Sequence, residues 1–289
     1  MEHAVQLRTQ RFVEVIRRQL DELTRLEELP LVITESRQGN RWLFDCQFEL
    51  PAGCRREDGV VLRIQQYYLA GAIAQAIATL YEEEYARRRL RLKYRMKRDD
   101  CDLVVPKIRE YLDKELKGDT YRTNRRTRLM AQILNCLEAH PVFDLEGFLT
   151  FRAQDYRAEL DRALELAVEQ YLVQREYVEF VRLLKHFVDA QTPRLDVLHV
   201  GISSQGRFQL YNDAGKKVTQ QFLDEMSSHD ESSDISCEDL LISALIAVAP
   251  RQIVFHVRYD GYQETLQTIR SVFEERVSYC TGCAICAKL

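Results

Sequence analysis

The sequence lacks any apolar segment long enough to cross a membrane. A spanning helix needs about 20 consecutive apolar residues, and the longest candidate here, Leu240 to Ala249, is about half that length and contains Ser243. The first residues hold arginines scattered among apolar residues, with no continuous hydrophobic region before a small-residue cleavage site. We therefore expect a cytoplasmic protein without a transmembrane segment or a secretion signal.

Common enzyme signatures are also missing. The chain contains no G-x-x-x-x-G-K-[ST] phosphate loop, no G-x-G-x-x-G, no H-E-x-x-H and no G-x-S-x-G. Its histidines are dispersed, and a lone histidine on a predicted strand, such as His199 or His256, is more often a core or edge residue than a catalyst. The sequence therefore identifies no reaction and leaves open whether the protein is an enzyme.

The composition is that of a globular protein. Of the 289 residues, 46% are hydrophobic and 30% are charged, so there is enough apolar area to offset the entropy of the chain. This length allows one large or two moderate domains, and we favour two. The net charge of -4 argues against a protein that binds polyanions over its whole surface.

Helical spacing of apolar residues dominates residues 1–192. The expected helices cover Phe12 to Leu26, Val61 to Met96, Val105 to Leu116 with Pro106 near the first turn, Asn124 to Glu138, Leu145 to Val173, and Tyr177 to Ala190. Two β-rich runs on either side of Gly39-Asn40 predict a β-hairpin near 31–49. Residues 1–192 are thus expected to form a mainly helical domain with one small hairpin.

Strands and helices alternate after Thr192-Pro193. The expected strands are Leu195 to Val200, Phe208 to Tyr211, Gln252 to Val257 and Arg276 to Tyr279, with helices at Glu238 to Val248 and Glu264 to Glu275. This alternation predicts a small sheet covered by helices. The fold class is therefore α+β, with residues 193–289 forming a small α/β domain that ends in a cysteine cluster.

That cluster is the most specific feature of the sequence. Cys280-Thr281-Gly282-Cys283-Ala284-Ile285-Cys286 is a C-x-x-C-x-x-C run. Two-residue spacing lets neighbouring thiolates converge on one soft metal ion, and Gly282 permits the tight turn that this requires. Cys280, Cys283 and Cys286 are therefore candidate ligands of zinc or an iron–sulfur cluster.

The cysteine run leaves its fourth ligand and its chemistry open. The ferredoxin pattern continues with a further cysteine and a proline, whereas Ala287-Lys288-Leu289 follow here. Cys237, His256, a partner chain or a small molecule could supply the missing ligand. Alternatively, Cys280 and Cys283 could form a redox pair with Cys286 as a third thiol, or all three could simply pack in the core. We assign the isolated cysteines to packing; these are Cys46, Cys54, Cys101 and Cys136.

A second candidate site is a run of arginines and lysines between Arg87 and Arg98. Helical spacing would place Arg87, Arg91, Arg95 and Arg98 along one face, where they could follow a phosphate backbone. Glutamates lie four residues before Arg87 and before Arg88, which is typical of an ordinary solvated helix. We favour the solvated helix over nucleic-acid binding, because no known binding module accompanies the charge.

Three segments and the terminal cysteines carry a family resemblance. The segments are Tyr177 to Asp189, Glu238 to Ile246, and Ala249 to Val254. With them the chain resembles the YtxC-like family of sporulation proteins of endospore-forming bacteria. The resemblance implies a cytoplasmic protein linked to sporulation, with no assigned biochemical activity and no active-site residues to carry over.

Three functions follow from these features. The first is an accessory protein of sporulation that binds an unknown protein partner and carries a metal or thiol centre at the terminal cysteines. The second is a thiol-redox or metal-dependent enzyme that uses the same cysteines. The third is a nucleic-acid binder acting through the basic helix 87–98.

Overall fold

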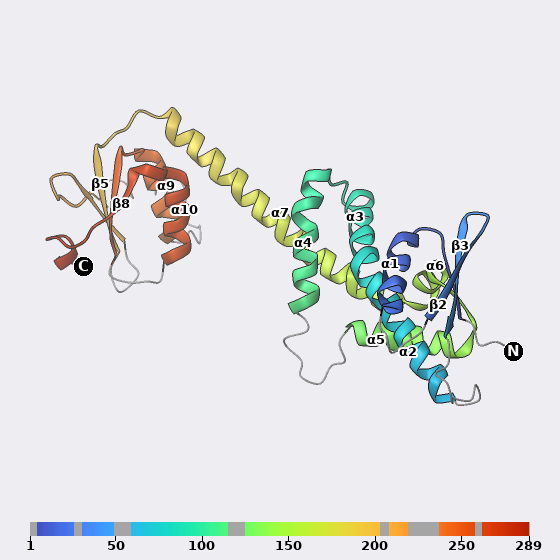
Figure 1. The fold of residues 1–289 in the computed structure, drawn as a ribbon. Helices are drawn as coiled ribbons and strands as arrows, with labels where there is room; N and C mark the ends of the chain where they lie inside the picture. Colours follow the sequence, from blue (N-terminus) through green and yellow to red (C-terminus); the bar gives the residue numbers. More distant parts are fainter. Residues whose placement is uncertain are drawn as a thin grey trace. The chain divides into compact units, whose positions relative to one another are not determined.

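The chain folds into two compact units, Met1–Tyr171 and Leu172–Leu289. A computed structural model describes residues 5–25, 31–48, 59–114, 125–202, 208–218, 237–257 and 262–288 (Figure 1). Helices predominate, and each unit contains one four-stranded sheet. The α+β fold class expected from the sequence is confirmed.

The sheet of the first unit is built around the expected hairpin. β2 (Leu31–Gln38) pairs antiparallel with β3 (Arg41–Phe48), and Gln38 lies opposite Arg41, so that Gly39 and Asn40 form the turn. Gly39 has φ +63°, which a glycine adopts without steric cost. β1 (Val5–Thr9) adds antiparallel to β3 and parallel to β4 (Val142–Asp144), giving the order β2-β3-β1-β4. These two short strands were not predicted.

The helices of the first unit include one long, nearly continuous stretch. α1 (Val13–Thr24) is followed by α2 (Gly59–Ala76), a π-helical turn η1 (Ile77–Tyr81) and α3 (Glu82–Lys93). The next helices are α4 (Arg98–Lys114), α5 (Arg125–Ala139), the short α6 (Leu145–Gly147), a second π-helical turn η2 (Phe148–Arg152), and α7 (Gln154–Ala190), which continues into the second unit. The two helices expected between Leu145 and Ala190 are therefore mainly one, α7.

The basic segment is not a single helix, which corrects the expectation for residues 87–98. α3 ends at Lys93, and Arg95 has φ +53°. The Met96 amide donates to the Leu90 carbonyl at 3.1 Å across this helix end. α4 begins at Arg98, with two aspartates in its first turn, and acidic residues favour a helix start. Arg95 and Arg98 therefore do not continue the face of α3 that carries Arg87 and Arg91.

The early start of α4 also moves Pro106. The sequence predicted this proline near the first turn of a helix, whereas it lies inside α4. An interior proline removes one backbone hydrogen bond of the helix. The neighbouring Val104, Val105 and Ile108 are nevertheless buried, so the apolar face of α4 remains packed on both sides of the proline.

A buried ion pair links three helices of the first unit. A Glu82 carboxylate oxygen on α3 accepts a hydrogen bond from Arg125 Nη2 on α5 at 3.0 Å and another from the Tyr156 hydroxyl on α7. Arg125 also donates to the Leu112 carbonyl at 3.1 Å. Glu82 and Arg125 are 7% and 8% exposed, so neither charge can turn to solvent if the other is lost.

Removing one charge of this pair should be costly. We expect Glu82→Gln to destabilise the first unit by about 3–5 kcal/mol, because Arg125 would stay buried without a counter-charge. Glu83→Gln is the matched control, since Glu83 pairs with Arg87 and Arg109 at the surface and should cost less than about 1 kcal/mol. Urea denaturation followed by circular dichroism checks this, and equal losses in the two variants would contradict it.

The second unit has the strand and helix order expected from the sequence. β5 (Val197–Ile202) and β6 (Phe208–Asn212) precede α9 (Cys237–Val248), β7 (Gln252–Val257), α10 (Gln263–Phe273), the 3₁₀ turn η4 (Glu274–Arg276) and β8 (Val277–Tyr279). The sheet order is β6-β5-β7-β8. β5 pairs parallel with β7, β7 pairs parallel with β8, and β6 is antiparallel to β5.

The core of the second unit lies on one face of its sheet. Alternate strand residues such as Leu198, Val200, Ile253 and Phe255 are fully buried in one cluster with apolar residues of α9 and α10. Figure 1 shows both helices on one side of the strands and the chain end on the other. The intervening strand residues, including His199 and His256, therefore face the terminal segment.

The limit between the two units falls within α7, at Tyr171 and Leu172. The last part of α7 belongs to the second unit, where Val188 is 1% exposed in the core. That residues 1–192 and 193–289 are separate domains stays a prediction. Among the described helices, none combines the length and apolar composition needed to cross a membrane.

Candidate metal centre

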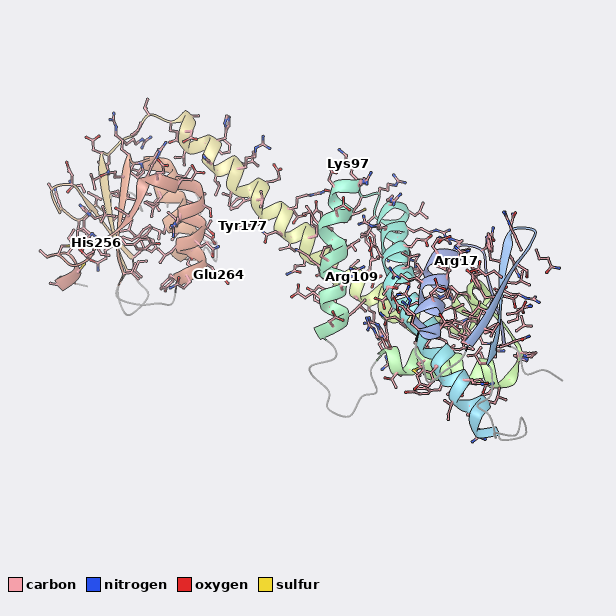
Figure 2. The ribbon with its side chains drawn as sticks, in the orientation of Figure 1. Arg17, Lys97, Arg109, Tyr177, His256 and Glu264 are labelled. Carbon is pink, nitrogen blue, oxygen red and sulfur yellow. The ribbon has the colours of Figure 1, made fainter. Side chains whose placement is uncertain are left out.

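The register of the second sheet places Cys280 beside His256. β7 and β8 pair parallel with Val254 opposite Ser278 and Phe255 opposite Tyr279. The Cys280 amide continues this ladder by donating to the Phe255 carbonyl at 2.8 Å. Because strand side chains alternate between the two faces, His256 and Cys280 lie on the face opposite the helices. Figure 2 labels His256 on this sheet.

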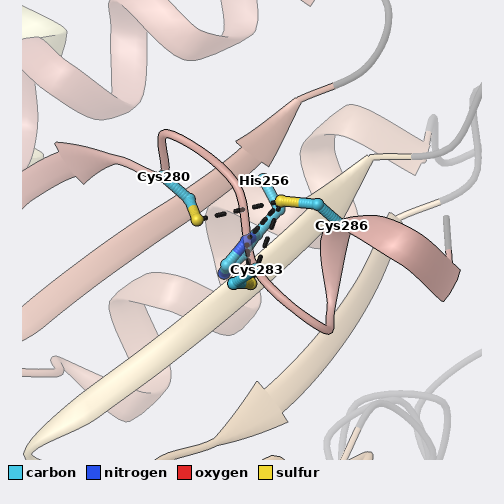
Figure 3. Close-up of side chains that lie close together, drawn as sticks. All are labelled: His256, Cys280, Cys283 and Cys286. Carbon is cyan, nitrogen blue, oxygen red and sulfur yellow. Dashed lines mark hydrogen bonds between the residues drawn. The ribbon is translucent and has the colours of Figure 1, made fainter.

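The two remaining cysteines come back to the same point. Nδ1 of His256 lies 3.2 Å from Cys286 Sγ and 3.4 Å from Cys283 Sγ. Cys286 Sγ lies 3.8 Å from Cys280 Sγ and 3.9 Å from Cys283 Sγ. All four donor atoms fall within 4.8 Å of one another, and Figure 3 shows the four side chains converging. This group could hold a metal ion.

Backbone amides line the turns that carry the sulfurs. The Gly282 amide donates to Cys280 Sγ at 3.4 Å, and Gly282 has φ +139°, a conformation that favours glycine. After Cys283 the chain turns into the 3₁₀ helix η5 (Cys286–Lys288), where the Ala287 amide donates to the Cys283 carbonyl. Donation by the Cys286 amide lowers the pKa of the Cys283 thiol below its usual range. The turn thereby favours the thiolate of Cys283, and the thiolate is the form that binds metals.

The fourth donor is a buried histidine with a second histidine behind it. His256 is 1% exposed, and its Nε2 lies 3.1 Å from Nδ1 of His199 on β5. Burial lowers the pKa of His256, and the neighbouring His199 lowers it further. A neutral imidazole is the metal-binding form, and a hydrogen bond through Nε2 leaves Nδ1 pointing at the sulfurs.

One of the fourth ligands that the sequence left open, His256, lies beside the three cysteines. The side chain of Cys237 lies outside the described residues. His199 was not recognised as part of the site, because only the pairing of β5 with β7 places it next to His256. No spacing in the sequence could have indicated that contact.

The other cysteines have surroundings typical of packing. Cys46 is fully buried and its thiol donates to the Phe44 carbonyl, while Cys101 is 1% exposed. Cys136 is half-buried, and Cys54 lies outside the described residues.

The candidate nucleic-acid residues are separated by the break between α3 and α4. Arg87 is engaged by Glu83 at 2.9 Å and by Asp102 at 2.6 Å. Arg91, Arg95 and Arg98 are exposed. Nucleic-acid binding by these residues stays a prediction.

Fold and site together define a two-unit α+β protein with a candidate Cys₃His metal centre. The chain belongs to the YtxC-like family, whose sequence model matches residues 67–278, as the resemblance noted in the sequence had indicated. The match includes His199 and His256 and ends before Cys280.

A relative in Bacillus subtilis (strain 168) is described as "Uncharacterized protein YtxC". It is 28% identical over 166 residues, which are 56% of this chain and 57% of the relative. The chain thus spans little more than half the length of that relative. No solved structure matches the chain.

Thiol reactivity should separate the site from the packed cysteines. Burial raises the pKa of Cys46 to about 12, whereas Cys283 is exposed and its thiolate is favoured. In metal-stripped, reduced protein near neutral pH, we expect iodoacetamide to modify Cys46 at least about 100-fold more slowly than Cys283. Peptide mass spectrometry over time measures both rates. Unfolding in urea should abolish the difference, and equal rates in the folded protein would contradict the assignment.

Proposed function

We propose that His256, Cys280, Cys283 and Cys286 bind one zinc ion, which stabilises the C-terminal unit of an accessory protein of sporulation. The observation that supports zinc is the distance between the sulfur atoms. Tetrahedral zinc with bonds of about 2.3 Å to sulfur requires sulfur atoms about 3.8 Å apart. Two of the three sulfur–sulfur distances, those from Cys286 to Cys280 and to Cys283, are 3.8 and 3.9 Å and match this requirement.

A single ion suits the donors better than an iron–sulfur cluster. In a cluster the protein ligands are shared between two or more iron atoms, so the ligands are spread around a larger inorganic core. Here all four donor atoms lie within 4.8 Å of one another. Zinc also accepts three thiolates and one imidazole in structural sites.

The number of protein ligands favours a structural role over catalysis. Catalytic zinc keeps one position open for water or substrate, whereas structural zinc is enclosed by four protein ligands. His199 supports the same role, because a partner on the second nitrogen of a ligating histidine fixes the orientation of its ring. Zinc would then bind the terminal segment to β7, and this segment would cover the sheet face opposite the helices.

The cellular role rests on the family resemblance rather than on the site. The link to sporulation is what the resemblance to the YtxC-like family implies, and thiolate ligands fit a reducing compartment such as the cytoplasm. The accessory protein would act by binding a protein partner. A thiol-redox enzyme and a nucleic-acid binder remain the competing functions, and the experiments below distinguish them.

Metal analysis tests the zinc site. We expect about one zinc per chain in protein purified without oxygen, and less than about a tenth of that in His256→Ala or in Cys280→Ser/Cys283→Ser/Cys286→Ser. Cys136→Ser is the matched control and should keep its zinc. The cobalt-substituted protein should show the absorption of a tetrahedral thiolate site.

Two outcomes would overturn the zinc assignment. Stoichiometric iron with acid-labile sulfide would show that the site holds an iron–sulfur cluster and not zinc. Absence of metal, together with a reversible disulfide among the three cysteines, would favour the thiol-redox enzyme.

A genetic test addresses the cellular role. In the organism that encodes this chain, we expect deletion of the gene to lower the count of heat-resistant spores at least about tenfold without slowing vegetative growth. The unchanged gene should restore the count, and the triple cysteine variant should not, because the C-terminal unit would lack its zinc. A deletion strain with normal spore counts would remove sporulation from the proposal.

A further inference from the structure

A cleft in the first unit has the size of a small-ligand site. It lies where the turn between β1 and α1 meets η1, α3 and the start of α7. Its volume is about 430 Å³, within the range usual for small-molecule pockets. All of its lining residues belong to the first unit, so the cleft is independent of the metal centre.

Positive charge predominates in the cleft. The lining contains the basic residues Arg11, Arg88, Arg89, Lys93 and Arg157, against the acidic residues Glu84 and Glu146. Both acids already have partners in the chain. Glu84 pairs with Arg11, and one Glu146 oxygen accepts from the Thr9 hydroxyl at 2.8 Å and from two backbone amides of the β1–α1 turn. Among the basic residues, Arg11 pairs with Glu84, Arg89 with Asp161 and Lys93 with Glu165. Arg88 and Arg157 therefore supply the positive charge that remains available to an anion.

Arg157 and Arg88 have N–H groups that could donate hydrogen bonds to a ligand. Arg157 Nη2 donates to the Thr150 carbonyl at 2.8 Å, while its Nε is buried without a hydrogen-bond partner. Arg88 is exposed, and within the described residues it has no ion pair. A buried unpartnered donor costs free energy, and movement of the Arg157 side chain toward an anion in the cleft would give this donor an acceptor.

Aromatic side chains and both π-helical turns meet at the same place. The Tyr81 ring, at the end of η1, lies 6.1 Å from the Phe12 ring and 5.5 Å from the Tyr85 ring. Burial raises the pKa of Tyr81 to about 12, so its hydroxyl remains a donor. Leu149 and Thr150 belong to η2. π-Helical turns are rare and occur frequently at functional sites.

We propose that this cleft binds a small phosphorylated molecule with a planar ring, of about the size of a nucleoside phosphate. Arg88 and Arg157 contact the phosphate, the Tyr81 hydroxyl donates to it, and the aromatic side chains pack against the ring. From the basic run Arg87 to Arg98, the cleft is lined by Arg88, Arg89 and Lys93 and not by the four residues expected to follow a phosphate backbone.

Isothermal titration calorimetry on the full chain tests the proposal with nucleoside mono- and diphosphates. We expect saturable binding that weakens about tenfold or more in Arg88→Gln and in Arg157→Gln, because each loses a charge-assisted hydrogen bond. Arg87→Gln is the matched control, since the neighbouring Arg87 is engaged by Glu83 and Asp102, and it should bind within about twofold of the unchanged protein. Circular dichroism melting establishes that each variant is folded.

Further probes make the proposal falsifiable. Inorganic phosphate should compete, and the unphosphorylated nucleoside should bind at least about tenfold more weakly. The triple cysteine variant should bind normally, which separates this cleft from the zinc proposal. Lack of binding at millimolar nucleoside phosphate would overturn the inference. Salt-dependent binding of oligonucleotides alone would also overturn it, in favour of nucleic acid.

Discussion

The parallel pairing of β7 with β8 is the constraint on which the C-terminal unit depends. It sets Ser278 opposite Val254, and the Cys280 amide extends the same ladder to the Phe255 carbonyl. One face of this sheet is covered by α9 and α10. The opposite face carries the two histidines, and the chain end returns to it. A shift of one residue in this register would turn His256 toward the core and away from the sulfurs.

The first unit is organised around the stretch from α2 to α3, whose polar residues face in different directions. Glu82 points into the interior, where its charge is balanced by Arg125. Glu83 and Arg87 form exposed ion pairs. Arg88 and Arg89 line the cleft instead. The charged residues of this stretch are consecutive in the sequence, but the helix turns them toward the interior, the solvent and the cleft, respectively.

The sequence allowed most elements to be predicted, because their apolar spacing is regular and their ends carry turn residues. This holds for the hairpin at Gly39-Asn40 and for all four strands of the second sheet. The failures have local causes. β1 and β4 are too short for an alternating pattern to be recognised. The break at Arg95 was missed because α4 begins only three residues later, at Arg98, so the helical spacing of residues continues through it in the sequence. The three cysteines were recognisable because their spacing is itself the chemical signal.

By itself, the sequence determined the fold class, the family resemblance and three of the four donors of the candidate metal centre. These properties depend on residue type and on spacing within a few positions. Only the tertiary structure decided that His256 completes the donor set, that His199 lies behind it, and that Arg88 and Arg157 share a cleft. Each of these contacts joins residues far apart in the chain, and strand register and helix packing bring them together.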